Sequence, residues 1–343
     1  MARAAFYERD HAIRIDDVMV VPPGPDEVQV RIAYVGICGT DLHIYHGKMD
    51  WRVAPAQIMG HEVSGVVSAI GEEVRDVDVG QKVTVMPLDP CGTCPACRAG
   101  HGHICLNLKF LGIDTPGGFQ SYWTVPAHTI LPLPVSMSLK RAALIEPLAV
   151  ACHDVRLGAV KAGESVVVLG GGPIGALIGL VAQHVGADVL VSEINPQRVR
   201  IGGDLGLEVV NPQEVDLPGL VETRTGGAGA DVVFEVTATV SGAEMMTKLP
   251  RTRGRMVIVG IFSDPPPVDL FRVLWRELQL CGARVYERQD FERAIELASG
   301  GALPLESLIS EVYALQRLPA GLQKLGQGGD VMKILIDLQG EEA

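Results

Sequence analysis

The stretch SVVVLGGGPIG, residues 165–175, decides the fold class of this chain. Residues 165–169 have the length and β-branched content of a buried strand, and the G-x-G-x-x-G pattern follows at once. In that pattern the first glycine makes a tight turn, the second lets the backbone approach a pyrophosphate, and the third lets helix pack on strand. A proline opening the helix fits as well, because its fixed φ suits a first helical turn. The residues predicted to bind the dinucleotide are Gly170, Gly172, Pro173, Ile174 and Gly175.

Downstream of this stretch the alternation of strand and helix continues. Residues 188–192, 231–236 and 255–259 are predicted strands, and each is separated from the next by a segment long enough for a helix. Strands that alternate with helices imply a parallel sheet covered on both faces. The middle of the chain is therefore predicted to be a doubly wound α/β domain.

Two residues after the second predicted strand bear on the choice of cofactor. Glu193 lies 18 residues beyond Gly175, where a carboxylate can accept hydrogen bonds from the adenosine ribose hydroxyls. That carboxylate would repel a 2'-phosphate, so NAD is favoured over NADP. Arg198 is close enough in sequence to weaken this preference, and we count it among the cofactor-binding residues.

The N-terminal part of the chain has a different pattern. Residues 28–32 alternate apolar and polar side chains directly after a proline-rich turn, and residues 63–70 and 82–85 repeat this. No helical period is visible before about residue 138, so these short strands predict an antiparallel β domain. One more strand, residues 331–338, ends the chain.

Length and composition set the limits on function. A chain of 343 residues is too long for one ordinary core, and 47% hydrophobic with 20% charged residues is typical of a globular protein. A formal charge of −12 disfavours nucleic acid as a partner. No apolar run is long enough to span a bilayer, and no secretory signal opens the chain, so we expect a cytoplasmic protein without a membrane partner.

Four of the seven cysteines have the spacing C-x2-C-x2-C-x7-C in a loop rich in Gly and Pro. Four thiolates fill a tetrahedral zinc and leave no open position, so such a site is structural. An iron–sulfur cluster is the main rival, because three closely spaced cysteines and a fourth also suit it. Disulfides are disfavoured in a cytosolic chain. The predicted ligands of the structural zinc are Cys91, Cys94, Cys97 and Cys105.

A second metal site is predicted between residues 38 and 62. Cys38 and His61 offer a thiolate and an imidazole, and Glu62 adds a carboxylate. This mixture is typical of a catalytic zinc, which keeps one position open for water or substrate. We therefore expect two zinc ions per chain.

The order of these motifs carries a family resemblance. CGTDLHIYHG begins at Cys38, GHE ends at Glu62, the four-cysteine loop follows, EPLAVACH begins at Glu146, and the glycine turn comes last. Together they resemble the zinc-dependent medium-chain dehydrogenase/reductase family over essentially the whole chain. Within it, the chain is similar to the polyol, butanediol and threonine dehydrogenase branch.

The resemblance implies a fold in two domains. Residues 1–149 and 285–343 would form a β catalytic domain like the chaperonin-10 barrel, and residues 150–284 an inserted Rossmann domain that binds NAD. The active site would lie in the cleft between the two domains.

The resemblance also implies a ligand set. Cys38 and His61 would bind the catalytic zinc, with Glu62 as an adjacent or exchangeable ligand and Glu146 as the ligand from the domain junction. Classical alcohol dehydrogenases have a cysteine where Glu146 stands. Lys333 loosely matches a basic residue that offsets the glutamate of GHE in relatives. Which glutamate binds zinc at rest stays open.

The implied reaction is oxidation of a secondary alcohol to a ketone, with hydride transfer to NAD from a zinc-bound alkoxide. One thiolate and one carboxylate cancel the charge of Zn²⁺ and leave it a usable Lewis acid. By resemblance, Thr40 takes the alcohol proton and passes it through the nicotinamide ribose to His43 and solvent. A side chain that titrates near neutrality suits that exit. His46 and His153 are further candidates for the cleft.

The substrate class is a polyol, a vicinal diol or a threonine-like hydroxy amino acid. CGTDLHIYHG favours threonine dehydrogenases, whereas EPLAVACH favours the butanediol and sorbitol enzymes. Residues 47–57, 110–119 and 261–274 would set specificity. Relatives pair the edges of their Rossmann sheets, so we expect a homodimer or homotetramer with residues 278–285 as the edge strand.

Two other functions compete with this prediction. One is an NAD- and zinc-binding protein that serves a structural or sensing role without turnover, and a weaker one is a zinc-free quinone reductase. The complete set of ligand and relay residues disfavours both, because neither function needs them.

Overall fold

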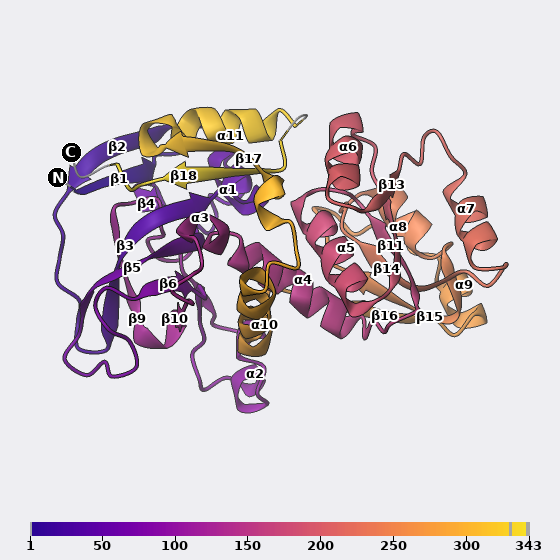
Figure 1. The fold of residues 1–343 in the computed structure, drawn as a ribbon, viewed down its shortest axis with the longest axis horizontal. Coiled ribbons are helices and arrows are strands. Elements are labelled where there is room, and N and C mark those ends of the chain that lie inside the picture. The colour runs from indigo at the N-terminus through magenta and orange to yellow at the C-terminus, as the bar shows by residue number, and fades with distance from the viewer. Residues whose placement is uncertain (1, 329–330, 341–343) are drawn as a thin grey trace. The chain divides into compact units, whose positions relative to one another are not determined.

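The computed structural model describes residues 2–328 and 331–340, and it divides the chain into two compact units. The first unit is formed by the chain up to Glu146 and from Glu287 onward, and the second by Pro147–Tyr286. In Figure 1 the first unit runs through indigo and purple and returns in yellow, and the second runs from magenta to orange. The β-rich unit is therefore built from both ends of the chain.

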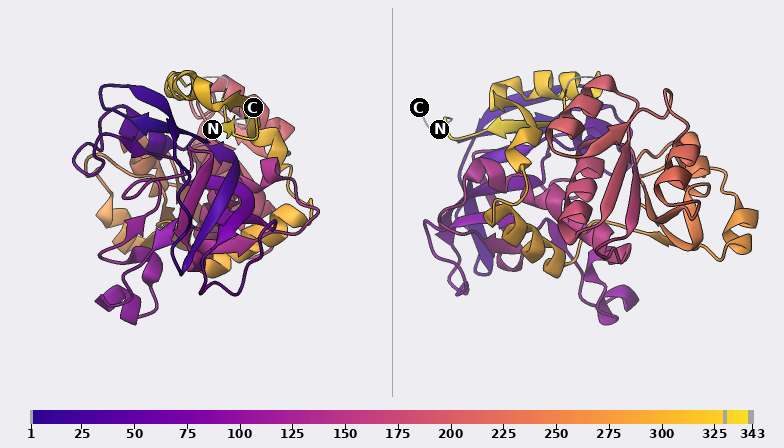
Figure 2. Two further views of the ribbon diagram at one scale, coloured as in Figure 1. Left: turned by 90° about the vertical axis from the view of Figure 1, so that its left-hand side faces the viewer. Right: turned by 45° about the vertical axis from the view of Figure 1, so that its right-hand side comes forward.

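A mixed sheet forms the first unit. Its strand order is β10-β6-β5-β3-β18-β17, and β9 pairs with β3 beside this path. β3 pairs antiparallel with both β5 and β18, so a strand from near the end of the chain lies against one from near its start. Figures 1 and 2 show yellow β18 beside indigo β3. The strands are β3 Glu27–Gly36, β5 Glu62–Ile70, β6 Lys82–Val85, β9 Tyr122–Pro126, β10 Ile130–Pro132, β17 Ile309–Ala314 and β18 Lys333–Asp337.

Smaller elements cover this sheet. β1, β2 and β4 form a separate small sheet, and β7 pairs with β8. The strands are β1 Ala2–Tyr7, β2 Ile13–Val18, β4 Gln57–Ile58, β7 Leu88–Asp89 and β8 Lys109–Phe110. The helices are α1 Gly39–Tyr45, α2 Pro95–Arg98, α3 Leu139–Ala142, α10 Arg288–Ser299 and α11 Leu318–Gly326, with 3-10 turns η1 Gly102–Ile104, η2 Ala127–Thr129, η3 Leu305–Leu308 and η4 Leu315–Arg317.

The strands predicted at residues 28–32, 63–70 and 82–85 are confirmed within β3, β5 and β6, and the one predicted at 331–338 contains the shorter β18. Two features differ from the prediction. β17 and β18 pair in parallel, so the domain is not purely antiparallel. Helix α1 also forms long before residue 138. A helix of seven residues is too short to display a helical period in the sequence, which is why the pattern does not reveal it.

The second unit is a parallel sheet with the strand order β13-β12-β11-β14-β15-β16. The order reverses beside β11, which is the point where doubly wound sheets bind their ligands. The strands are β11 Ser165–Leu169, β12 Asp188–Ser192, β13 Glu208–Val210, β14 Ala230–Glu235, β15 Pro250–Ile258 and β16 Gln279–Gly282. The helices are α5 Pro173–Val185, α6 Pro196–Asp204, α7 Leu217–Arg224, α8 Val240–Met246 and α9 Leu270–Trp275, and α4 Ile145–Leu157 leads into the unit.

Strand β11 lies at the centre of this sheet and is apolar on both faces. Val166, Val167, Val168 and Leu169 are all buried, as expected for a parallel strand covered by helices on each side. Val167 and Leu169 belong to the same core cluster as Met256 of β15. Within the described part of the chain, no helix combines the length and apolarity needed to cross a membrane.

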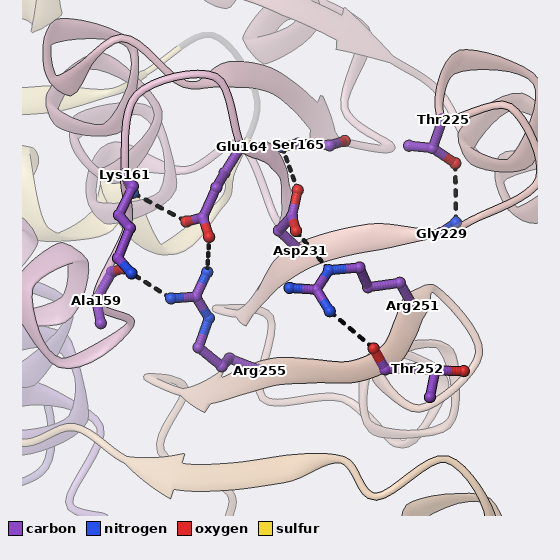
Figure 3. Close-up of polar contacts among 10 residues, drawn as sticks. All are labelled: Ala159, Lys161, Glu164, Ser165, Thr225, Gly229, Asp231, Arg251, Thr252 and Arg255. Atoms are coloured by element: carbon purple, nitrogen blue, oxygen red, sulfur yellow. Dashed lines mark hydrogen bonds and ion pairs between the residues drawn. The ribbon is translucent and has the colours of Figure 1, made fainter.

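A network of ion pairs and hydrogen bonds closes the amino-terminal edge of this sheet (Figure 3). Arg255 pairs with Glu164, and Asp231 accepts hydrogen bonds from the Ser165 amide at 2.9 Å and Arg251 Nε at 2.5 Å. Burial alone would raise the pKa of Asp231, but the hydrogen bonds from Arg251 and Ser165 lower it. The network joins the starts of β11, β14 and β15. Because open α/β sheets bind ligands outside the carboxyl ends of their strands, a ligand is expected at the opposite edge.

Candidate functional site

The turn after β11 has the geometry that a dinucleotide requires. Gly170 has a φ of +105°, which favours glycine, and a Cβ at Gly175 would lie 1.8 Å from the carbonyl oxygen of Gly170. Gly172 caps helix α5, and Pro173 is its first residue. The free amides of the first helical turn and the helix dipole make this end of α5 suited to a pyrophosphate. The residues present therefore fit the predicted cofactor.

Glu193 and Arg198 both lie at this turn. Glu193 is buried directly after β12, where Oε2 accepts a hydrogen bond from the Gly171 amide at 3.0 Å and Oε1 accepts one from the Asn195 amide at 2.8 Å. Each carboxylate oxygen has a second lone pair available for a ribose hydroxyl. Nη1 of Arg198 lies 3.6 Å from where a Cβ of Gly172 would stand. A carboxylate and a guanidinium therefore flank the same glycine turn.

Helix α1 positions the first group of the predicted catalytic site. Cys38 caps the helix, and its backbone amide donates to Oδ2 of Asp41 at 2.8 Å. Asp41 is fully buried, and burial raises the pKa of its carboxyl group. Sγ of Cys38 lies 3.8 Å from Oγ1 of Thr40. The sequence analysis missed Asp41, although an acidic residue three positions after a helix cap is a recognisable capping pattern.

The structure brings Cys38, His61 and Glu62 together. One ligand atom from each lies within 4.8 Å of the others. His61 is 3% exposed, and its Nδ1 is buried without a hydrogen-bond partner among the described residues. Burial alone would lower the pKa of His61, but the Cys38 sulfur and the Asp41 and Glu146 carboxylates raise it to about 10. An unpaired buried nitrogen beside a sulfur and two acidic groups fits a divalent cation.

Glu62 has a second partner that comes from the other end of the chain. Nζ of Lys333 lies 2.6 Å from Oε1 and 2.7 Å from Oε2 of Glu62, and it also donates to the carbonyl of Ile37 at 3.2 Å. The side chains of Lys333 and Glu62 are 5% and 1% exposed. Burial would lower the pKa of Lys333, but the Glu62 carboxylate raises it. Both oxygens of Glu62 are thus held by an ammonium group.

Glu146 stands apart from the close group of three. It is the second residue of α4 and is 5% exposed. Its charge acts on both His61 and Lys333, and in each case it raises the pKa. Glu146 therefore lies in the same neighbourhood, while its carboxylate oxygens are outside the set of ligand atoms that converge within 4.8 Å.

The predicted histidines occupy different environments. His43 lies in the last turn of α1, where its partial burial and the electrostatic influence of Lys48 and His46 lower its pKa. His46 caps the end of the same helix and contacts the ring of His11 edge to face at 5.1 Å. His153 is buried in α4, with Nδ1 3.1 Å from Nη2 of Arg156. Of these, His43 shares a helix with Thr40 and Cys38.

The four-cysteine loop forms a separate group around α2 and η1 that could hold a metal ion. The sulfur atoms of Cys91, Cys94, Cys97 and Cys105 converge within 4.8 Å, and all seven cysteines of the chain are free thiols. Backbone amides point at the sulfurs, as in the hydrogen bond from Cys91 N to Cys105 Sγ at 3.3 Å. Hydrogen bonds from the backbone and side chain of Thr93 lower the pKa of Cys91 to about 5. Such a set is suited to a thiolate-bound cation.

Two of the predicted specificity segments are joined beside His61. Phe110 packs its ring edge to face against His61 at 5.3 Å, and its amide donates to Oδ2 of Asp114 at 2.7 Å. Asp114 also pairs with Arg52, through Nε to Oδ1 and Nη2 to Oδ2, both at 2.6 Å. Sequence reasoning did not single out Arg52 or Asp114, because nothing local relates residues 62 positions apart.

Comparison with known families supports both halves of this description. Residues 24–135 match the model of the alcohol dehydrogenase GroES-like domain, and residues 173–300 match that of the zinc-binding dehydrogenases. The first match lies within the β-rich unit, and the second covers most of the parallel-sheet unit and continues into residues 287–300 of the β-rich unit.

Several individual proteins are similar over nearly the full chain. A 2-dehydro-3-deoxy-L-galactonate 5-dehydrogenase of Pseudoalteromonas atlantica is 50% identical over 339 residues, covering 99% of each chain. An L-galactonate-5-dehydrogenase of Escherichia coli K12 is 32% identical over 86% of this chain and 87% of its own. Among solved structures, a zinc-binding dehydrogenase of Sinorhizobium meliloti 1021 bound to NADP superposes with a TM-score of 0.92 at 32% identity, covering 98% and 99%.

Proposed function

Since this chain belongs to the zinc-dependent medium-chain dehydrogenase family and is an enzyme that oxidises secondary alcohols, we propose that its substrate is a 2-dehydro-3-deoxy sugar acid, oxidised at C5. The observation that carries this proposal is the 50% identity, over 99% of both chains, with a relative named for that reaction. The C5 hydroxyl of such an acid is secondary and belongs to a vicinal diol, which agrees with the substrate class expected from the sequence.

The residues of the first unit suit the proposed chemistry. Cys38 and His61, with Glu62 or Glu146, would hold the zinc ion, and bound zinc makes an alcohol proton easier to remove. We favour Glu146 as the resting ligand, because both oxygens of Glu62 are already paired with Lys333. The Glu62–Lys333 ion pair, whose charges cancel, would then support Cys38 and His61 without binding zinc itself.

Thr40 and His43 are placed to move the alcohol proton. They stand three positions apart on α1 and so share a face of that helix. The hydroxyl of Thr40 is close to the Cys38 sulfur, and His43 is exposed. Because the pKa of His43 is lowered, its ring is neutral at pH 7 and can accept a proton. Thr40 would accept the proton from the substrate, and His43 would pass it to water.

We propose NAD as the physiological acceptor. Buried Glu193 at the end of β12 would repel a 2'-phosphate, whereas Arg198 on the other side of the glycine turn would attract one. Replacing Glu193 with Ala should erode the preference for NAD. Because Arg198 is retained in this variant, its activity with NADP should also increase. Unchanged discrimination between NAD and NADP in that variant would refute the assignment.

We also propose two zinc ions per chain, one at the Cys38 site and one at the four-cysteine site. Metal analysis of the purified protein tests this directly. Two zinc per chain is the expected result, and one zinc or a stoichiometric amount of iron would overturn it.

A second copy of the chain is the proposed partner. β16 forms an edge of the parallel sheet, with unpaired backbone groups that a second β16 could satisfy. In the segment that leads into β16, α9 exposes Leu270, Phe271, Leu274 and Trp275 by 69 to 73% of their surface. Trp275→Ser should weaken the oligomer in light scattering, and a wild-type monomer would contradict the proposal.

A substrate panel tests the proposed reaction. Reduction of NAD is measured with 2-dehydro-3-deoxy-L-galactonate, L-galactonate, sorbitol, 2,3-butanediol and L-threonine. The highest kcat/KM is expected for the first of these. A higher value for sorbitol, butanediol or threonine would replace the proposed substrate with that one.

A further inference from the structure

The proposed substrate is an anion, and the chain as a whole carries a formal charge of −12. A negatively charged protein needs a local cation wherever it binds a carboxylate. The cations on the segments that approach His61, residues 46–58 and 109–119, are Lys48, Arg52 and Lys109. Lys48 and Lys109 are exposed, whereas Arg52 is held in place by side-chain contacts.

We propose that Arg52 binds the substrate carboxylate and is held in position for this by Asp114. This inference rests on the proposed function, since it names a site for the acid group of the same substrate. It adds a specificity-determining residue to the reaction. In the sugar acid, the carboxylate stands at the opposite end of the carbon chain from C5, so its binding residue must lie near the metal ligands without being one of them.

The guanidinium of Arg52 has one edge occupied and one available. Asp114 accepts from Nε and Nη2 in a bidentate pair with both distances at 2.6 Å. Among residues 2–328 and 331–340, this guanidinium makes no other hydrogen bond, so Nη1 and the second proton of Nη2 remain free. These donors form a fork that matches a carboxylate, and the Arg52 side chain is 24% exposed.

The position of Arg52 relative to the metal ligands follows from the turn that carries Asp114. Gly112 of this turn approaches His61 so closely that a Cβ would lie 3.3 Å from the His61 Cβ. Phe110 contacts the His61 ring and is hydrogen-bonded through its amide to Asp114. Gln57 adds a second tie, from Nε2 to the carbonyl of Ile113 at 3.3 Å. Through Asp114, Arg52 is therefore bonded directly to the turn that packs on His61.

Asp114 acts here as a positioning residue. Its Oδ2 accepts hydrogen bonds from both the Phe110 amide and Nη2 of Arg52. Asp114 thereby links Phe110, which contacts the His61 ring, to the guanidinium. A carboxylate that holds the Nε edge leaves the free edge in one fixed orientation, and it lowers the entropy lost when an anion binds. A lysine at position 52 would supply charge without this geometry.

The test compares the acid with its uncharged methyl ester. The wild-type enzyme should have a higher kcat/KM for 2-dehydro-3-deoxy-L-galactonate than for the ester. In Arg52→Gln this preference should fall by about 10- to 100-fold, mainly through KM for the acid, since hydrogen bonds to charged groups have that strength. Arg52→Lys should retain part of the preference. Asp114→Asn, which keeps the arginine but loosens it, should also reduce it.

The matched control is Arg14→Gln. Arg14 is also paired with carboxylates, Glu8 and Asp16, and it lies on β2, which β1 separates from β4 in the small sheet. Arg14→Gln changes the net charge by the same amount as Arg52→Gln and should leave the preference for the acid over the ester unaltered. Thermal melting of all variants shows whether each is folded, and Arg52→Lys carries the test if Arg52→Gln is not.

The outcomes separate this inference from the proposed function. An enzyme that does not oxidise the acid at all refutes the proposed function and this inference with it. Oxidation of the acid with no preference over the ester, or an equal preference in wild type and Arg52→Gln, refutes only the role of Arg52.

Discussion

The Cys38 site and the four-cysteine site both contain cysteine sulfur, but the residues of the first come from distant parts of the chain and those of the second from one short segment. Cys91, Cys94, Cys97 and Cys105 belong to one lobe around α2 and η1, and amides of that lobe donate to their sulfurs. Cys38 caps α1, His61 directly precedes β5, Glu62 is the first residue of β5, and Lys333 comes from β18. The four-cysteine group is a local structure, and the Cys38 group exists only once the sheet has formed.

The two sites also differ in the charged groups that are buried beside their sulfur atoms. Of the four lobe cysteines, Cys91 and Cys97 are half-buried and Cys94 and Cys105 are buried. His61, Glu62 and Lys333 are each at most 5% exposed. Burying a carboxylate requires a partner charge, which Lys333 supplies. The Cys38 group therefore includes its own counter-charge, whereas the four-cysteine group consists of its sulfur atoms alone.

The largest effect on turnover is expected when the sulfur of Cys38 is removed. In Cys38→Ser we expect kcat to fall about a thousand-fold or more, because the transition state loses several kcal/mol of stabilisation by the metal. Steady-state kinetics and metal analysis measure the effect, with zinc expected to fall from two to one per chain. The fold should persist, because Cys38 is a partly exposed helix cap. Wild-type turnover in Cys38→Ser would refute a catalytic metal at this site.

The proton relay should give the next largest effect. Thr40→Val removes the hydroxyl beside Cys38 while conserving the shape of the side chain. We expect kcat to fall about 100-fold, the lower end of what general acid–base groups contribute. Both zinc ions should remain bound. Thr40→Ser is the matched control and should recover most of the activity, and equal losses in the Val and Ser variants would show that the hydroxyl is not used.

The Glu62–Lys333 pair should respond mainly in stability and metal content. Lys333→Met leaves the Glu62 carboxylate buried without its partner, and breaking a buried ion pair in this way costs about 3–5 kcal/mol. We expect a lower melting temperature and weaker retention of the zinc at Cys38 and His61.

A double-mutant cycle isolates the pair. Adding Glu62→Gln to Lys333→Met removes both charges and should restore much of the lost stability. Full zinc content and an unchanged melting temperature in Lys333→Met would show that the pair does not support the site.

The contrast between the two sites also explains what the sequence could predict. The four-cysteine spacing and the glycine turn after β11 are local patterns, so their residues were identified without a structure. The pairing of Glu62 with Lys333 spans 271 positions, and sequence comparison within the family suggested it only loosely. The parallel pairing of β17 with β18 likewise depends on the assembled sheet, and no local sequence pattern predicts it.

The smallest effect on turnover is expected at the four-cysteine site. Cys97→Ser should lose one zinc per chain and lower the melting temperature, because a tetrahedral thiolate site contributes to folding of the lobe that it closes. The value of kcat for the folded protein should stay within about 10-fold of wild type, since no residue of this lobe belongs to the Cys38, His61 and Glu62 group. Cys97→Ser and Cys38→Ser are thus reciprocal controls, each removing a different zinc ion. If Cys97→Ser abolished turnover while its melting temperature stayed high, the division between a structural and a catalytic site would be wrong.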